Sequence, residues 1–151
     1  MRKRTRAREF ALQLLYQYEM NENDLPGLFA RFWEENAEAE SEVRDYAERL
    51  VQGTVENLKP LDETITRYAE NWQLHRMAVI DRNILRFAAY ELLYMPEEIP
   101  PKVAINEAVN IAKKFSQEEA GKFVNGILDK INHTERKPDG TETQKPKGPV
   151  P

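Results

Sequence analysis

The chain has 151 residues, of which 40% are hydrophobic and 32% are charged, and its formal net charge is −4 at pH 7. That composition provides one sizeable apolar core under a well-solvated surface. The absence of cysteine excludes disulfides, thiolate metal sites and cysteine nucleophiles. The sequence shows no secretory signal and no apolar run of about 18 residues, so we expect a soluble, cytoplasmic protein that does not enter a membrane.

Apolar residues recur at the helical spacing along nearly the whole chain, which predicts an all-α fold of about seven helices. The first predicted helix covers residues 2–18. The second begins at residues 24–26, where Asp-Leu-Pro is a typical helix start. Ser41 is expected to cap a third helix that Pro60 stops, and a short fourth helix carries the apolar residues of segment 61–72, which ends at Trp72.

The segment from about residue 78 to 95 is apolar on most sides of the helical wheel, which predicts a central, buried fifth helix. Glu91 falls on its apolar side. Because an unpaired buried carboxylate is costly, we expect Glu91 to have a partner such as an arginine. The proline-rich residues 96–101 end this helix, and a sixth helix follows with an inner stripe that ends at Phe115.

A last helix is predicted from about residue 117 to 131. Ser116 and Glu119 have the spacing of a capping box at its start. The helix contains Gly121 and Gly126, each of which costs roughly 1 kcal/mol relative to alanine. We expect the close packing of a neighbour or a ligand to offset that cost.

The residue types that carry enzyme chemistry are scarce in this chain. The two histidines, His75 and His133, are far apart, and the two serines, Ser41 and Ser116, fit helix caps better than nucleophiles. The six glycines form neither a dinucleotide-binding fingerprint nor a phosphate loop, and zinc-binding His-Glu-x-x-His spacing is missing. We therefore predict no enzymatic activity, no catalytic residue, no metal and no cofactor.

Positive charge is concentrated at the N-terminus, a pattern that favours phosphate and hence nucleic acid. Residues 1–8 hold five cations and no anion, whereas residues 9–46 hold ten carboxylates against two arginines. On a helical wheel the cations surround the first turns of an amphipathic helix, and Tyr16 points nearly opposite the apolar stripe, so it should be exposed. The simpler alternative is a disordered basic tail that aids solubility.

A second basic cluster lies at the predicted corner between the last two helices, where Lys113, Lys114 and Lys122 accompany Phe123. A helix N-terminus there adds backbone N–H groups for an anion, and Phe123 could stack on a base. The pattern alone favours a plainer alternative, in which Phe123 belongs to the core and the lysines are ordinary solvated charges.

These segments together resemble the NusB family. The resemblance rests on residues 6–16 (RAREFALQLLY), 84–92 (ILRFAAYEL), 103–108 (VAINEA), 112–115 (AKKF) and 122–130 (KFVNGILDK), in the right order and spacing. It extends over roughly residues 2–132. It implies one domain, residues 1–136, built as two packed helical bundles of about residues 1–60 and 61–136, and it leaves residues 137–151 as a disordered tail.

The resemblance also implies a function. Proteins of this family act in bacterial transcription antitermination. With NusE, a ribosomal protein of the small subunit, they bind the single-stranded boxA element of ribosomal RNA leader transcripts. The pair assembles with NusA and NusG on RNA polymerase and suppresses premature, Rho-dependent termination. Whether the free protein is a monomer or a homodimer remains open.

Carried over residue by residue, the resemblance implies two surfaces. The RNA surface would comprise Arg2, Lys3, Arg4, Arg6, Arg8, Lys113, Lys114, Lys122 and Phe123. The NusE surface would include Tyr16, Asp81 and Arg82.

Two alternatives remain. NusB-like domains also precede the catalytic domains of ribosomal RNA cytosine methyltransferases, and this sequence, which lacks cysteine and a cofactor-binding α/β pattern, would then be the RNA-targeting half. The other alternative is a helical protein-interaction module without an RNA role.

Overall fold

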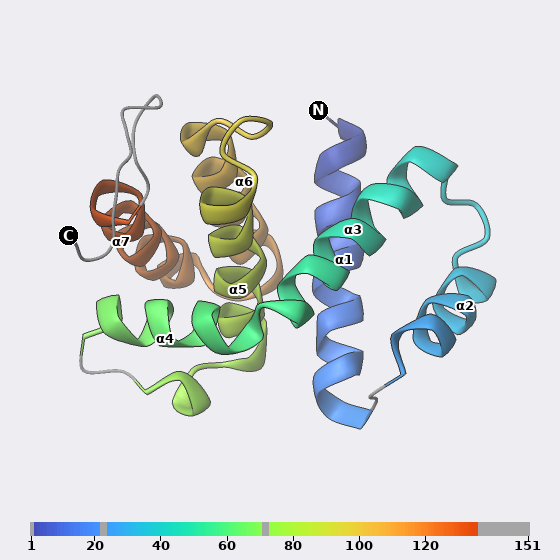
Figure 1. The fold of residues 1–151 in the computed structure, drawn as a ribbon, viewed down its shortest axis with the longest axis horizontal. Helices are drawn as coiled ribbons and strands as arrows, with labels where there is room; N and C mark the ends of the chain where they lie inside the picture. The colour runs from blue at the N-terminus through green and yellow to red at the C-terminus, as the bar shows by residue number, and fades with distance from the viewer. Residues whose placement is uncertain (1, 22–23, 71–72, 136–151) are drawn as a thin grey trace.

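The computed structural model describes residues 2–21, 24–70 and 73–135. They form seven α-helices and one short 3-10 helix, with no β-strand among these residues, which confirms the predicted all-α fold (Figure 1). The helices are α1 (Arg2–Asn21), α2 (Leu25–Glu35), α3 (Ser41–Glu56), α4 (Leu58–Tyr68), η1 (Leu74–Arg76), α5 (Val79–Tyr94), α6 (Pro101–Phe115) and α7 (Glu118–Thr134). The predicted tail, residues 137–151, and Trp72 lie outside the described residues.

The helices form two groups that pack side by side, with α1, α2 and α3 in one group and α4 to α7 in the other (Figure 1). Helix α5 contacts α1 and α3 across the boundary as well as α4, α6 and α7 in its own group. The buried apolar side chains of both groups form one continuous cluster. The two bundles therefore share a single core, and α1 belongs to that core along most of its length.

Three aromatic rings fasten α2 to α1. Phe10 of α1 and Phe32 and Trp33 of α2 meet edge to face, with ring centroids 4.9 to 5.6 Å apart. This geometry places the positive edge of one ring on the negative face of the next. The indole nitrogen of Trp33 donates a hydrogen bond of 2.7 Å to Glu48, which ties the same cluster to α3.

Helix α5 is the central helix, as its apolar wheel predicted. Six of its apolar side chains are fully buried: Ile84, Leu85, Phe87, Ala88, Ala89 and Leu92. They point to several sides because α5 has neighbours on several sides. Among the described residues, no helix combines the length and apolar character that a bilayer crossing requires.

The predicted start of the second helix is confirmed. Asp24 is the N-cap of α2 and accepts a hydrogen bond of 3.3 Å from the backbone N–H of Gly27. Pro26 lies in the first turn of α2, where its missing N–H costs nothing because backbone N–H groups of the first turn have no intrahelical acceptor. Sequence and local structure therefore agree at this helix start.

Three other predicted boundaries were wrong. Glu40 precedes Ser41 as the N-cap of α3, and Ser41 is the first helical residue. Ser116 is the C-cap of α6, its N–H bonded to the carbonyl of Ala112, and the N-cap of α7 is Gln117, which makes no side-chain cap hydrogen bond, so the predicted capping box does not form. Pro60 does not stop α3, which ends four residues earlier at Glu56; it lies in the first turn of α4, a position that tolerates proline.

Candidate nucleic-acid interface

The basic N-terminal segment is part of a helix. Helix α1 begins at Arg2, so every cation of the segment lies on its first two turns. Arg2, Lys3 and Arg6 are exposed, and Arg4 is half-buried. The segment therefore presents an ordered cationic face, because the apolar stripe that continues the same helix is packed into the core.

Arg8, which we assigned to the RNA surface, lies in the core and is 1% exposed. Its Nε donates a hydrogen bond of 2.8 Å to Glu91 of α5, and its Nη1 donates one of 3.1 Å to Glu107 of α6. Helices α5 and α6 supply these acceptors and close over this side of α1. Arg8 is thus the arginine partner that Glu91 was expected to need, and it does not belong to the exposed surface.

Tyr46 of α3 completes this buried cluster. Its hydroxyl donates a hydrogen bond of 2.6 Å to the same Glu91 oxygen that Arg8 contacts. Burial and the adjacent Glu91 carboxylate raise the pKa of Tyr46, so the hydroxyl keeps its proton and remains a donor. Burial also raises the pKa of Glu91, although Arg8 opposes that shift. The cluster ties α1 to α3, α5 and α6, and it fixes the direction in which the other cations of α1 point.

Two of the exposed cations of α1, Lys3 and Arg6, have close neighbours on the protein surface. Lys3 lies 3.1 Å from Glu40 and pairs with Glu42, at the start of α3. The Arg6 guanidinium stacks over the Phe10 ring at 4.2 Å from its centroid. These contacts hold the cations in defined positions on the surface.

The second basic cluster lies at the corner between α6 and α7. Lys113, Lys114 and Lys122 are exposed there, and Phe123 is half-buried and packs against the core. The stem of Lys113 covers Gly121, where an added Cβ would lie 3.0 Å from two of its carbons. Close packing of a neighbour therefore accounts for Gly121, whereas the same expectation was wrong for Gly126, where an added Cβ would meet no atom within 4 Å.

Glu9 joins the two basic clusters, which are more than 100 residues apart in the chain. Its side chain is 9% exposed and contacts Arg6 at 3.5 Å and Lys114 at 3.0 Å. One nearly buried carboxylate thus holds a cation of α1 beside a cation of α6. We call the combined set of exposed or half-buried cations the basic surface: Arg2, Lys3, Arg4, Arg6, Lys113, Lys114 and Lys122.

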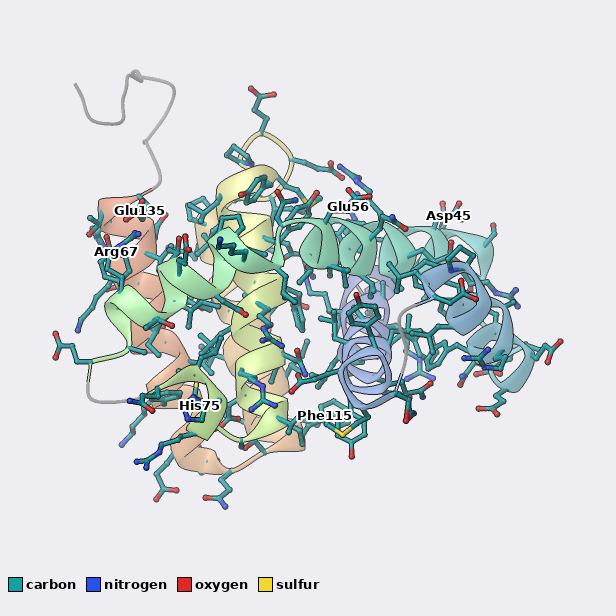
Figure 2. The ribbon with its side chains drawn as sticks, turned by 60° about the horizontal axis from the view of Figure 1, so that its bottom comes forward. Asp45, Glu56, Arg67, His75, Phe115 and Glu135 are labelled. Atoms are coloured by element: carbon teal, nitrogen blue, oxygen red, sulfur yellow. The ribbon has the colours of Figure 1, made fainter. Side chains whose placement is uncertain are left out.

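Phe115 was expected on the inner stripe of α6, but it is 38% exposed. Figure 2 labels it at the corner between α6 and α7, near α1. Its ring centroid lies 5.2 Å from the ammonium group of Lys114. The helix ends at this residue, so no further turn covers the ring, and an accessible aromatic therefore accompanies the basic surface.

The residues assigned to a protein partner lie at the other end of α1. Tyr16 is 47% exposed, which confirms the prediction from the helical wheel. Arg82 is half-buried, pairs with Glu19 of α1 and donates a hydrogen bond of 2.9 Å to the carbonyl of Met77. Its guanidinium therefore fastens the start of α5 to the end of α1. Asp81 is half-buried beside it.

Asp81 and Phe123 line the same pocket, so the residues assigned to the partner and to RNA approach each other there. The pocket has a volume of about 310 Å³ and also includes Met77 and Ala120 in its walls. Its position between the start of α5 and the start of α7 was not evident from the sequence, because the two segments are about 40 residues apart.

Sequence reasoning also missed a larger cavity beside the first turn of α1. Its volume is about 650 Å³, and its walls include Arg4, Arg49 and Glu98. Arg49 comes from α3, and Glu98 from the loop between α5 and α6. No local pattern marks either residue in the sequence.

The described residues include no group of three or more side chains placed to hold a metal ion. His75 and His133 are both exposed and come from different elements, η1 and α7. The candidate site is thus a charged surface bordered by the rings of Phe115 and Phe123.

Known proteins resemble this chain over most of its length. The model of the NusB family matches residues 5–133. The transcription antitermination protein NusB of Thermodesulfovibrio yellowstonii is 47% identical over 138 residues, which cover 85% of this chain and 91% of that protein. The protein of the same name from Anaeromyxobacter dehalogenans strain 2CP-1 is 46% identical over 129 residues, with coverage of 85% and 89%.

Solved structures show the same fold. A structure of T. maritima NusB superposes with a TM-score of 0.77 at 41% identity and covers 87% of this chain and 91% of that one. A crystal structure of the antitermination factors NusB and NusE in complex with dsRNA has a TM-score of 0.78 at 30% identity, with coverage of 88% and 98%. On the family match and these identities, the chain belongs to the NusB family.

Proposed function

We propose that this protein is a non-enzymatic, cytoplasmic antitermination factor that binds RNA through the basic surface and a ribosomal protein, NusE, through the region of Tyr16 and Asp81. The observation that carries the proposal is the contact of Glu9 with both Arg6 and Lys114, which unites two basic clusters into one cationic face. A phosphate backbone requires such a face, because its binding is driven largely by the release of condensed counterions.

The proposed RNA is the single-stranded boxA element of ribosomal RNA leaders. Single-stranded RNA exposes its bases, and Phe115 and Phe123 border the basic surface with aromatic rings on which bases can stack. In the cell the complex with NusE would assemble with NusA and NusG on RNA polymerase and suppress Rho-dependent termination. The chain matches about nine tenths of the length of two antitermination relatives, and this match supports the antitermination function over the methyltransferase-targeting alternative.

The partner region is proposed from its geometry. Tyr16 is an exposed aromatic on the same helix as the proposed RNA-binding cations, about three to four turns further along. A partner on that side would extend the surface offered to RNA without covering the basic clusters. The same exposed ring could bury itself in a homodimer when the partner is absent, so the free protein should be measured as well.

The test is an RNA titration with boxA and a scrambled RNA of equal length, each with and without NusE, at several salt concentrations. We expect boxA affinity to fall steeply with salt, by about 0.7 in log K per phosphate contact per log unit of salt. NusE should raise the RNA affinity, and RNA should raise the NusE affinity by the same factor. Equal, salt-independent binding of both RNAs would contradict the proposal, and so would an absence of binding.

A further inference from the structure

A carboxylate of the chain lies between two arginines beside the first turn of α1. Glu98 Oε2 accepts a hydrogen bond of 2.7 Å from Arg4 and one of 3.1 Å from Arg49, and its Oε1 accepts one of 2.6 Å from Arg49. The three residues come from α1, α3 and the loop between α5 and α6. The first turn of α1 and that loop both lie at the top of Figure 1. Two guanidinium groups thus converge on one anionic group.

The surroundings of this carboxylate form a recess. Glu98, Arg4 and Arg49 line the cavity of about 650 Å³, and Tyr46 lines it as well. The guanidinium carbon of Arg4 lies 4.4 Å from the centroid of that ring and that of Arg49 lies 5.9 Å from it. A shared aromatic support keeps both cations directed at the same place.

The arrangement matches the way proteins hold phosphate. Guanidinium groups bind planar carboxylates and phosphate oxygens through the same forked hydrogen bonds, so a carboxylate can occupy a phosphate site. Arg49 and Arg4 lower the pKa of Glu98, which keeps the group anionic. Glu98 is carried by a loop of residues 95–100, its side chain is 33% exposed, and it can leave the arginines without disturbing a helix.

We propose that Arg4 and Arg49 form a binding site for an RNA phosphate, and that Glu98 occupies this site in the free protein and is displaced when RNA binds. The proposal rests on the proposed RNA-binding function and adds Arg49 of α3 to the RNA path. It makes Glu98 an internal competitor of RNA. The cavity wall also contains Glu42 and Asp45, the latter labelled on α3 in Figure 2, and these carboxylates limit the site to a short stretch of backbone.

The proposal predicts opposite effects for the two partners of the pair. Glu98→Gln should raise RNA affinity about threefold to fivefold, the size expected for giving up one exposed ion pair. Arg49→Gln should lower RNA affinity and reduce the salt slope by about 0.7. Because a phosphate contact carries no sequence information, both changes should be the same for boxA and for scrambled RNA.

Glu97→Gln is the matched control for Glu98→Gln. Glu97 is the exposed neighbour in the same loop, and its substitution changes the net charge by the same amount. Arg67→Gln is the control for Arg49→Gln, because Arg67 is an exposed arginine paired with a carboxylate, Glu135, between α4 and α7. Far-ultraviolet circular dichroism and thermal unfolding should show that all four variants keep the fold.

The double variant Glu98→Gln with Arg49→Gln completes the test. If Glu98 competes for Arg49, most of the gain from Glu98→Gln should disappear when Arg49 is absent. An affinity gain no larger than that of Glu97→Gln overturns the proposal, and so does a loss of affinity, which would mean that Glu98 only steadies α1. RNA binding by the wild-type protein separates failure of the proposed function from failure of this inference. If the wild-type protein binds no RNA, the proposed function fails. If it binds RNA while the variants match their controls, only this inference fails.

Discussion

The carboxylate of Glu9 in α1 and the ammonium group of Lys114 in α6 lie 3.0 Å apart, although 105 residues separate them in the chain. Glu9 is nearly buried, whereas Lys114 is largely exposed. The pair therefore connects the core to the surface. It also sets the spacing between Lys114 and Arg6, which contacts the same carboxylate.

Removing either of these cations should weaken RNA binding by a similar amount. Arg6→Ala and Lys114→Ala should each lower the affinity roughly threefold to tenfold and reduce the salt slope by about 0.7, because each removes one phosphate contact. Fluorescence anisotropy at four salt concentrations would measure both quantities. Lys59→Ala, which removes an exposed cation of α4, is the control and should change neither. An unchanged slope in Arg6→Ala would exclude that side chain from the RNA path.

Breaking the buried pair of Arg8 and Glu91 should be costly, whereas replacing both residues should cost less. Glu91→Leu leaves Arg8 with Glu107 as its remaining acceptor and removes the acceptor of the Tyr46 hydroxyl, so we expect the free energy of unfolding to fall by about 3–5 kcal/mol. Adding Arg8→Met should recover part of that loss, because it removes the buried charge, although the Tyr46 hydroxyl still lacks its acceptor. Urea unfolding followed by circular dichroism would give the values.

The matched control for the buried pair is an exposed one. Arg67 and Glu135 are 3.0 Å apart where α4 meets α7, and Figure 2 shows both labels together. Arg67→Met should cost less than about 1 kcal/mol, because water screens an exposed pair. Additive losses from Arg8→Met and Glu91→Leu would show that the two side chains do not act as a pair.

Tyr16→Asp should impair partner binding without unfolding the protein. Tyr16 is 47% exposed, so a charge at this position stays in water in the free protein but would be buried in a complex. Isothermal titration with NusE should show at least a tenfold weaker affinity, and the melting temperature should change little. Tyr94→Asp is the control, since Tyr94 is 44% exposed on α5. Loss of the fold in Tyr16→Asp would mean that the ring is part of the core.

Two glycines in helices should respond to alanine in opposite directions. A Cβ at Gly53 would lie 2.1 Å from the ring of Tyr90, so Gly53→Ala must push α3 from α5 and should destabilise the protein by about 1–3 kcal/mol. A Cβ at Gly126 meets no atom within 4 Å, so Gly126→Ala should stabilise α7 by about 0.5–1 kcal/mol. Thermal unfolding of the two variants side by side would reveal the difference in sign.

Most of the fold was predictable because helical periodicity is a local property. The stripe of α1, the all-round apolar character of α5 and the need of Glu91 for a cation follow from the sequence alone. Helix ends were harder, since Ser41 and Ser116 have the composition of caps but the backbone turns one residue away from each expected position. Small differences in local energy decide such boundaries, and tertiary packing overrides them.

The candidate site was predictable only in part. The arginines of residues 1–8 are conspicuous, but the sequence does not distinguish a surface cation from a buried one. Arg8 is buried against Glu91, and this partner is 83 residues away in the chain, so no local pattern reveals the contact. Arg49 and Glu98 carry no local signal, since their relation arises from the way α3 meets the loop after α5. Long-range electrostatic pairs of this kind require the structure.

The buried guanidinium of Arg8 also locks the rotation of α1 about its own axis. Each residue of an α-helix advances the side chains by about 100°, so one extra residue between Arg6 and Arg8 would swing every upstream cation a quarter turn or more from its present direction. Additions before Arg2 would leave those directions untouched. The chain upstream of the anchor therefore tolerates a change of length at its tip and none between the anchor and the cations that it orients.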